Sequence, residues 1–122
     1  MNKSKNLKEE TLEVLKFYGK TERDVVWVGS TKTGLKVELN NFWEVAEGTY
    51  YDSGYGTAKI PTDLIVAGRD FWLEREEYDG SEWWTYRTTP SMPLETIKID
   101  TLIPSDGWGG NLADCKKEGF YD

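Results

Sequence analysis

The residues best suited to chemistry lie in one segment, residues 71–87, where carboxylates alternate with tryptophans and tyrosines. Paired acids of this kind catalyse glycoside hydrolysis, in which one carboxyl group protonates the leaving group and the other attacks the sugar or activates water. Such a pair also needs a cleft and a perturbed environment, whereas a run of acids is usually the solvated edge of a sheet. We therefore expect no enzyme and no catalytic role for the five acids, Glu74, Glu76, Glu77, Asp79 and Glu82.

The same segment has a strong hairpin signal, because Asp79 and Gly80 separate two strand-like runs and both tolerate the positive φ of a type I′ turn. A two-residue turn pairs Tyr78 with Ser81 and fixes which side chains share a face. One face then carries Phe71, Leu73, Arg75, Glu77, Glu82, Trp84, Tyr86 and Thr88, and its Leu73 and Tyr86 region should cover a helix.

The opposite face of the predicted hairpin is the candidate binding surface. Two tryptophans, a tyrosine, an arginine and carboxylates suit a stacking platform for a base or sugar, or an anchor at a protein interface. The plain alternative is that these side chains pack beneath the C-terminal residues or beneath the second predicted helix, near 41–47. The register also places Trp72 opposite Arg87 for a cation–π contact. The proposed contact residues on this face are Trp72, Glu74, Glu76, Tyr78, Trp83 and Arg87.

A second candidate surface is the tyrosine- and glycine-rich stretch at residues 49–58, which we expect to be an irregular loop. Tyrosine offers a large contact area at a low cost in side-chain entropy, so Tyr50, Tyr51 and Tyr55 are proposed binding residues. The alternative is that these rings cover the edge of the core.

Composition excludes several kinds of site. The chain has no histidine and one cysteine, Cys115, which excludes histidine bases, Cys-His pairs and the usual zinc sites. The glycine-rich stretches lack the Lys and Ser/Thr of a phosphate-binding loop. We expect no cofactor and no metal, and an inert Cys115.

The acidity of the chain indicates its class of partner. The net charge is −7 over 122 residues, which disfavours direct binding to nucleic acid and suits a basic protein surface, such as the groove of a nucleic-acid-binding protein. The first ten residues are charged where a signal peptide is apolar, and no run approaches the roughly 18 apolar residues of a membrane span. We expect a cytoplasmic protein with no membrane association. Homo-oligomers remain open.

The elements that must position these residues are predicted from periodicity. Apolar residues at helical spacing predict a helix near 7–18, with Asn6 as its cap and Gly19 as its stop, and a second near 41–47 capped by Asn40 or Asn41. Strands are predicted at 24–30, 63–67, 71–78 and 81–87. The fold class is α+β, an antiparallel meander of three to five strands packed on one or two short helices.

The predicted domain covers residues 1–90. Beyond it, residues 91–122 are rich in proline and glycine. This composition predicts an irregular extension with one potential strand at 96–103.

Four segments resemble a small uncharacterised family encoded by phages and prophages of Gram-positive bacteria: DVVWVGS at 24–30, YYDSGYG at 50–56, DLIVAG at 63–68 and FWLEREEYDGSEWWTY at 71–86. The resemblance covers residues 24–90 and carries no catalytic residues. It implies a phage accessory protein that blocks a host factor. We therefore expect a non-enzymatic, stoichiometric inhibitor of a bacterial defence system, such as an anti-CRISPR protein, in the host cytoplasm.

Two further hypotheses stay open. One is a binder that sequesters a nucleotide signal, stacking the base on tyrosine or tryptophan and meeting phosphate with Lys59, Arg69 or Arg87. The other is a structural or assembly component of the phage particle, which would form a stable homo-oligomer.

Overall fold

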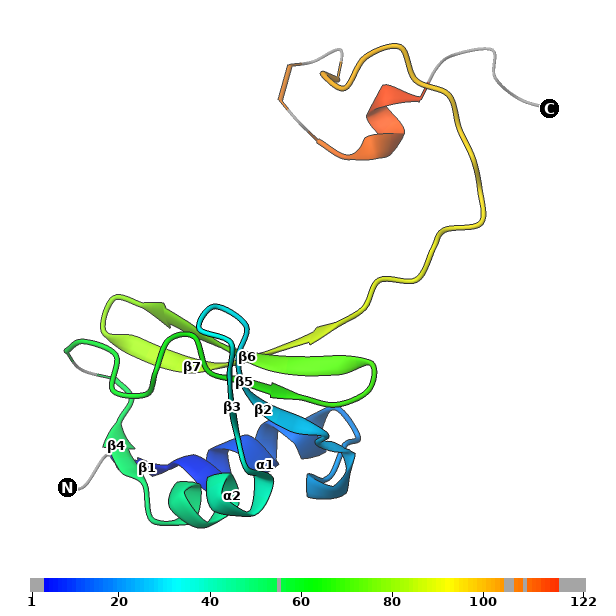
Figure 1. The fold of residues 1–122 in the computed structure, drawn as a ribbon. Helices are drawn as coiled ribbons and strands as arrows, with labels where there is room; N and C mark the ends of the chain where they lie inside the picture. The colour runs from blue at the N-terminus through cyan, green and yellow to red at the C-terminus, as the bar shows by residue number, and fades with distance from the viewer. Residues whose placement is uncertain (1–3, 55, 105–106, 109, 117–122) are drawn as a thin grey trace. The chain divides into compact units, whose positions relative to one another are not determined.

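A computed structural model of the chain describes residues 4–54, 56–104, 107–108 and 110–116. Contacts divide the chain into two units, Met1–Thr89 and Pro90–Asp122. The first unit has the expected α+β class and contains all of the helices and strands of the described residues apart from one short 3-10 turn (Figure 1). Its elements are β1 (Ser4–Asn6), α1 (Leu7–Phe17), η1 (Glu22–Asp24), β2 (Trp27–Ser30), β3 (Leu35–Val37), α2 (Leu39–Glu47), β4 (Tyr50–Asp52), β5 (Ile65–Ala67), β6 (Phe71–Tyr78) and β7 (Ser81–Thr88).

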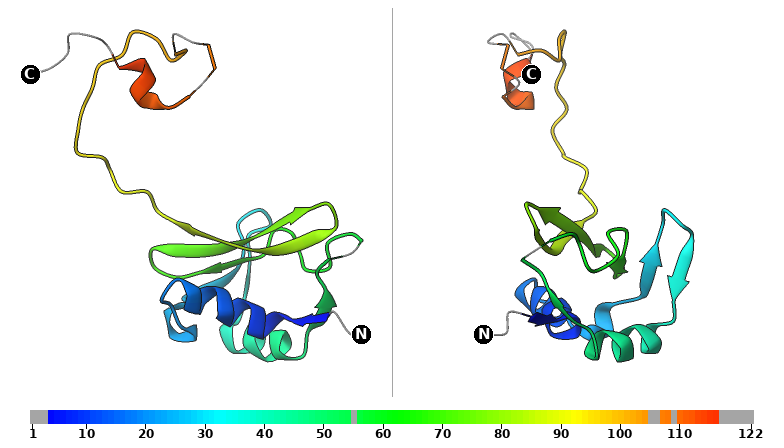
Figure 2. Two further views of the ribbon diagram at one scale, coloured as in Figure 1. Left: turned by 180° about the vertical axis from the view of Figure 1, so that it is seen from behind. Right: turned by 90° about the vertical axis from the view of Figure 1, so that its left-hand side faces the viewer.

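The main sheet has five antiparallel strands in the order β3-β2-β5-β6-β7. The β5-β6-β7 meander joins the β2–β3 hairpin through the pairing of β2 with β5. Both helices lie on the same side of this sheet (Figure 1), and the two hairpins form its opposite edges (Figure 2, right). The sheet therefore has an inner face toward the helices and an outer face on the other side.

A row of apolar side chains across the inner face forms the centre of the core. Val28, Val66 and Leu73 are paired in register on β2, β5 and β6, and each is fully buried. Leu15 of α1 is also fully buried, and Phe42 and Trp43 of α2 belong to the same cluster. The alternation of buried and exposed residues along β6 follows from the two-residue period of a strand with one face on a core.

The β6–β7 hairpin has the predicted register. Tyr78 pairs with Ser81 across the turn, and Asp79 and Gly80 both adopt positive φ, 50° and 86°, as a type I′ turn requires. Because a shift of one residue would move every side chain to the other face, this turn determines the composition of both faces.

The start of α1 confirms the predicted cap, since Asn6 accepts a hydrogen bond from the amide of Glu9 at 3.0 Å. Gly19 follows the helix with φ 74°. The expected cap of α2 was wrong. The helix begins at Leu39, and the carboxylate of Glu38 caps it by accepting from the amide of Asn41 at 2.6 Å. Asn41 thus lies inside the first turn of the helix, and its backbone amide donates to the capping residue Glu38.

Two predicted strands are shorter than expected. Residues 22–24 form the 3-10 turn η1, because the carboxylate of Asp24 turns back to accept from the amide of Thr21 at 2.7 Å, so β2 begins only at Trp27. Residues 61–64 form a turn in which the amide of Leu64 donates to the carbonyl of Pro61, so β5 begins at Ile65.

The tyrosine-rich stretch is not wholly irregular. Tyr50–Asp52 form β4, which pairs with β1 in a separate two-stranded sheet. Hydrogen bonds beside the pairing run from the amide of Leu7 to the carbonyl of Thr49, and from the side chain of Asn6 to the carbonyl of Glu47. This strand forms by pairing with a partner more than forty residues earlier in the sequence. The composition of residues 49–58 alone therefore could not predict it.

The second unit has little regular structure in its described residues. Its 3-10 turn η2 (Leu112–Cys115) is capped by Asn111, and Cys115 is buried. The predicted strand at 96–103 does not form, since only Ile99 takes part in a β-bridge, with Lys116. The ion pair of Lys116 with Glu95 lies beside this bridge.

The close approach of β2 and β3 leads to a prediction about Gly29. A Cβ at this position would overlap the backbone carbonyl of Leu35, which lies in the paired strand and cannot move aside. We expect Gly29→Ala to lower the free energy of unfolding by about 2 kcal/mol in urea titrations. Gly48→Ala is the matched control, because φ is −94° there and the nearest atom is 3.8 Å from the added Cβ. Equal stability of the two variants would contradict this account.

Candidate functional site

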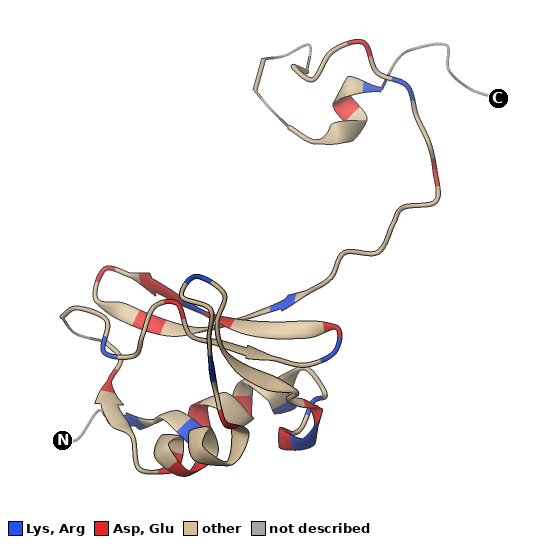
Figure 3. Cartoon of the chain, in the orientation of Figure 1, with Lys and Arg blue, Asp and Glu red and all other residues tan. Residues whose placement is uncertain are grey.

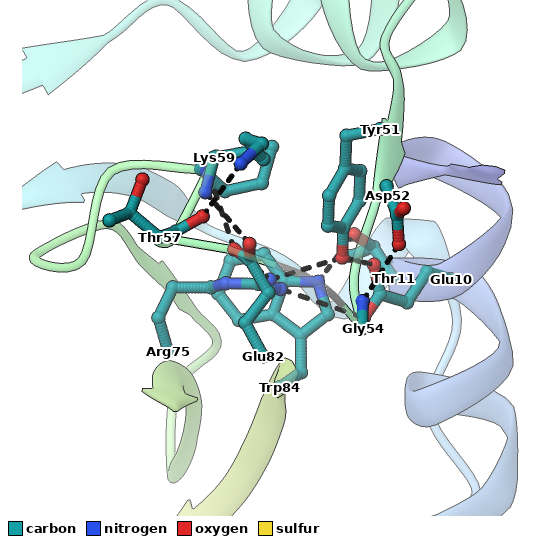
Figure 4. A network of polar contacts seen from close by, with 11 residues as sticks. Glu10, Thr11, Tyr51, Asp52, Gly54, Thr57, Lys59, Arg75, Glu82 and Trp84 are labelled. Carbon is teal, nitrogen blue, oxygen red and sulfur yellow. Dashed lines mark hydrogen bonds and ion pairs between the residues drawn. The ribbon is translucent and has the colours of Figure 1, made fainter. Parts of the chain in front are cut away.

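The inner face of the hairpin carries a buried polar network rather than the solvated edge expected for its acids (Figure 4). Arg75 projects from β6 into the core, where its side chain is 2% exposed. Its Nη2 atom donates to Glu82 of β7 at 3.0 Å and to the Tyr51 hydroxyl at 3.1 Å, and its Nη1 atom lies 3.6 Å from Glu10 of α1. One guanidinium group thus connects both sheets to the first helix.

Aromatic groups complete the surroundings of the guanidinium. Its central carbon lies 4.7 Å from the centre of the Trp84 ring, in a cation–π contact, and the indole Nε1 of Trp84 donates to Thr11 at 2.9 Å. The hydroxyl of Thr11 donates in turn to the carbonyl of Leu7. The Nε and Nη1 atoms of Arg75 have no hydrogen-bond partner among the described residues, although Nη1 lies within ion-pair distance of Glu10.

The pKa values of Glu82 and Tyr51 in this network are shifted in opposite directions. Burial by itself raises the pKa of Glu82, but donation from the amide of Lys59, from Arg75 and from the amide of Ile60 outweighs burial, and the net pKa lies below its ordinary value. Burial, and then donation to the carboxylate of Glu10, raise the pKa of Tyr51, so its hydroxyl stays protonated. These groups lie inside the protein and serve as a structural anchor.

The outer face is the candidate functional site, and we call it the tryptophan face. The register places Trp72, Glu74, Glu76, Trp83 and Arg87 together on it, as the sequence predicted. Trp83 is exposed and Trp72 is half-buried, while Leu73 of the inner face is fully buried and Tyr86 is partly buried against the core. Tyr78 lies at the tip of the hairpin with 77% of its surface exposed.

Two residues that the sequence did not single out extend this face. The side chains of Trp27 on β2 and Ile65 on β5 lie on the same side of the sheet as this face. Ile65 is paired with Glu74, and Trp27 is paired with Ala67, which is in turn paired with Trp72. Both are half-exposed. Residues 25–28 are all apolar and show no alternation, so only the pairing of β2 with β5 assigns Trp27 to the tryptophan face.

The charged residues of the face form a ladder. Arg87 Nε donates to Glu74 at 2.7 Å, and Arg87 Nη2 lies 3.5 Å from Glu76. Arg87 is thereby held by two carboxylates rather than by the ring of Trp72 that the sequence predicted. Because the three side chains are about half exposed, the ladder contributes little to stability, but it holds a net negative charge between tryptophans.

The three proposed tyrosines do not act together. Tyr50 is 67% exposed on β4, whereas Tyr51 is 7% exposed, and its hydroxyl is engaged in the Arg75 network. The expectation that Tyr51 belongs to an accessible surface was therefore wrong, because strand alternation turns it inward. Tyr55 lies outside the described residues. The loop does meet the hairpin, since the amide of Glu82 donates to the carbonyl of Ser53 at 2.8 Å.

A hollow lies at the end of the tryptophan face, beside the β5–β6 turn. It encloses about 380 Å³, and its aromatic and charged lining residues are Trp27, Phe71, Trp72, Arg69 and Asp70. An adjoining hollow of about 490 Å³ shares Arg69 and adds Lys20 and Arg23. Basic and acidic segments meet at this turn and at η1 (Figure 3). Of the three predicted phosphate ligands, only Arg69 lies here, since Arg87 is held by acids and Lys59 Nζ donates to the carbonyl of Thr57.

The described residues contain no group of three or more histidine, cysteine or acidic side chains arranged to hold a metal ion. None of their helices is long and apolar enough to cross a membrane. A scan against protein-family models, a search of curated proteins and a search of solved structures gave no match. The tryptophan face therefore has to be interpreted from its own geometry.

The electrostatics of Glu82 predict a pH dependence. Because the pKa of Glu82 is lowered from 4.5 in the folded state, its contribution to stability is present above that value and is lost as the pH falls through the folded-state pKa. We expect Glu82→Gln to cost about 3 kcal/mol at neutral pH, because buried Arg75 then keeps only the more distant carboxylate of Glu10, 3.6 Å away, and to flatten the acid limb of the stability curve.

Urea titrations between neutral pH and the acid transition measure this effect. Glu77→Gln is the control, because Glu77 lies opposite Glu82 in the hairpin and is exposed. An acid limb that is as steep in Glu82→Gln as in the wild type would assign the pH dependence to other carboxylates.

Proposed function

We propose that the protein is a non-enzymatic accessory protein of phage or prophage origin, which inhibits a bacterial defence protein by binding it stoichiometrically. The observation that carries this proposal is the tryptophan face, where Trp27, Trp72 and Trp83 flank a ladder of two glutamates and one arginine. Large aromatic rings that remain accessible on a folded surface are the residues that most often dominate protein interfaces.

The charge of the face supports a basic partner. Glu74 and Glu76 share a single arginine, and Glu77 and Asp79 are exposed at the tip of the same hairpin. With a net charge of −7 for the chain, association with a positively charged groove is accelerated, and association with nucleic acid is opposed. The groove of a nucleic-acid-binding defence protein has this chemistry, and the carboxylates would occupy the positions of phosphates.

The face is also held rigidly, which favours recognition without rearrangement. The inner side of the same two strands is anchored by Arg75, so the outer side chains start from a defined backbone. Less conformational entropy is then lost on binding than with a mobile loop. The origin in a phage and the target in host defence come from the sequence resemblance, and the binding mode comes from the face.

A plating assay tests the proposal in hosts that each carry one nucleic-acid-binding defence system. We expect the wild type to restore phage growth in one such host and to form a one-to-one complex with the purified defence protein. Trp83→Ala should weaken that complex about tenfold or more, because it removes the most exposed tryptophan of the face. Glu76→Lys should do the same through charge reversal.

Val45→Ala is the matched control, because Val45 is 58% exposed and belongs to α2, which lies on the opposite side of the sheet from the tryptophan face (Figure 1). Full activity of Trp83→Ala and Glu76→Lys would move the interface elsewhere. Failure to restore growth in any defended host, together with no complex, would contradict the function itself.

The hollow beside the β5–β6 turn favours a second candidate function, the sequestration of a nucleotide. Trp27 and Trp72 offer ring faces to a base, and Arg69 joins this hollow to one that also contains Lys20 and Arg23, where phosphates would lie. Asp24 and Asp70 also line the second hollow and partly offset its positive charge, and Lys20 Nζ is 4.0 Å from Asp70.

Thermal unfolding with a panel of mono-, di- and cyclic nucleotides tests this second function. A bound nucleotide should raise the melting temperature by mass action, and Arg69→Gln should abolish the rise. Arg87→Gln, which removes an arginine already held by glutamates, should leave it unchanged. If no nucleotide raises the melting temperature of the wild type, the hollow has no such ligand.

A further inference from the structure

Strand β7 is an edge of the main sheet, and part of its backbone is unpaired. Ser81, Trp83, Thr85 and Arg87 direct their backbone groups toward β6, which leaves the alternate residues directed outward. The outward amide of Glu82 donates to Ser53. Trp84 and Tyr86 are the next outward-directed residues, and within the described part of the chain their backbone groups accept or donate no hydrogen bond.

An aromatic ledge lies beside this open edge. The groove between α1 and β7 encloses about 560 Å³ and is lined on the helix side by Glu13, Val14, Phe17 and Tyr18. Phe17 is 81% exposed, although it belongs to a well-formed helix. Tyr18 stacks on Tyr86 with ring centres 3.9 Å apart and makes an edge contact with Phe17 at 5.0 Å.

An unpaired strand edge next to exposed apolar side chains is a site for another strand, because a long edge without protection tends to pair with a further chain. The opposite edge of the sheet differs in this respect. Strand β3 has only three residues, and Lys36 is exposed at its centre, which discourages pairing there. The open edge of β7 is therefore the place where this sheet can be extended.

We propose that the occupant is a second copy of this chain, which pairs antiparallel through β7 about a two-fold axis at Thr85. Four backbone hydrogen bonds then form, because Trp84 exchanges two with Tyr86 of the second copy and Tyr86 exchanges two with Trp84 of the second copy. Trp84 and Tyr86 lie one on each side of Thr85, so this axis pairs both of them, and the outward-directed Thr88 of each chain lies opposite Glu82 of the other at the end of the ladder.

The side chains agree with this register. On the outer face, Trp83 lies opposite Arg87 of the second copy, so a ring faces a cation. On the inner face, Trp84 lies opposite Tyr86 of the second copy, so two aromatic residues meet. No like charges are opposed within 83–87. A two-fold axis perpendicular to the sheet also brings α1 near α1 of the second copy, which would bury Phe17.

The dimer would join two tryptophan faces into one continuous surface of ten strands. This inference does not depend on the identity of any host partner, so it stands or falls separately from the proposed function. Because each chain carries a charge of −7, self-repulsion opposes the dimer, and moderate salt should tighten it by screening.

Sedimentation equilibrium gives the first test. The wild type should show twice the mass of the 14.0 kDa chain, with a dissociation constant that falls as salt is raised. Thr85→Glu places two carboxylates face to face at the axis, and Phe17→Ser removes the exposed ring, so each should raise the dissociation constant about tenfold or more. Leu35→Ser is the matched control, because Leu35 is 70% exposed on the opposite edge and should leave the constant unchanged.

Disulfide trapping tests the register. In a Cys115→Ser background, Thr85→Cys should form a disulfide-linked dimer under mild oxidation, because residues facing each other in a non-hydrogen-bonded pair have the Cα separation that a disulfide requires. Ser81→Cys on the same strand should not, since it lies four residues from the axis. A monomeric wild type at the highest soluble concentration overturns the proposal. So does a dimer that survives both Thr85→Glu and Phe17→Ser, or one that Ser81→Cys traps and Thr85→Cys does not.

Discussion

The first unit depends on one buried guanidinium group. Arg75 lies in the core between carboxylates from α1 and β7 and beside a tyrosine from β4, so a single side chain connects elements that are far apart in sequence. A buried charge is costly unless partners surround it, and here two acids, a hydroxyl and the ring of Trp84 do so. The cluster therefore stabilises the fold only when all of its elements are correctly assembled. This requirement favours one arrangement of the chain over others.

Because the hairpin directs Arg75 inward, its other face is directed outward. The two-residue turn at Asp79 and Gly80 makes these two outcomes inseparable, since a shift of one residue in the register would bury Glu74 and Glu76 and expose Arg75. The anchor and the tryptophan face are thus two sides of the same pair of strands. The surface proposed for recognition inherits its rigidity from a polar network that a partner would never touch.

The same hairpin also accounts for the remaining features of interest. Its turn end meets the loop that follows β4, its other end borders the hollow beside Arg69, and its outer strand leaves an open edge next to α1. The acidic and aromatic composition of residues 71–87 therefore serves several purposes at once. Carboxylates that look alike in sequence have two different roles. Glu82 is buried and pairs with Arg75, whereas Glu74 and Glu76 are about half exposed and pair with Arg87.

The sequence by itself determined what local physics controls: the α+β class, the turn and register of the hairpin, the cap and stop of α1, and the membership of Trp72, Trp83, Glu74 and Glu76 in one face. These follow from side-chain periodicity and from residues that tolerate positive φ. Only the tertiary structure decided the pairing of β1 with β4, the inward direction of Tyr51, the arrival of Trp27 and Ile65 at the tryptophan face, and the burial of Glu82. Each of these depends on contacts between segments separated by many residues, and such contacts leave no periodic signal in either segment alone.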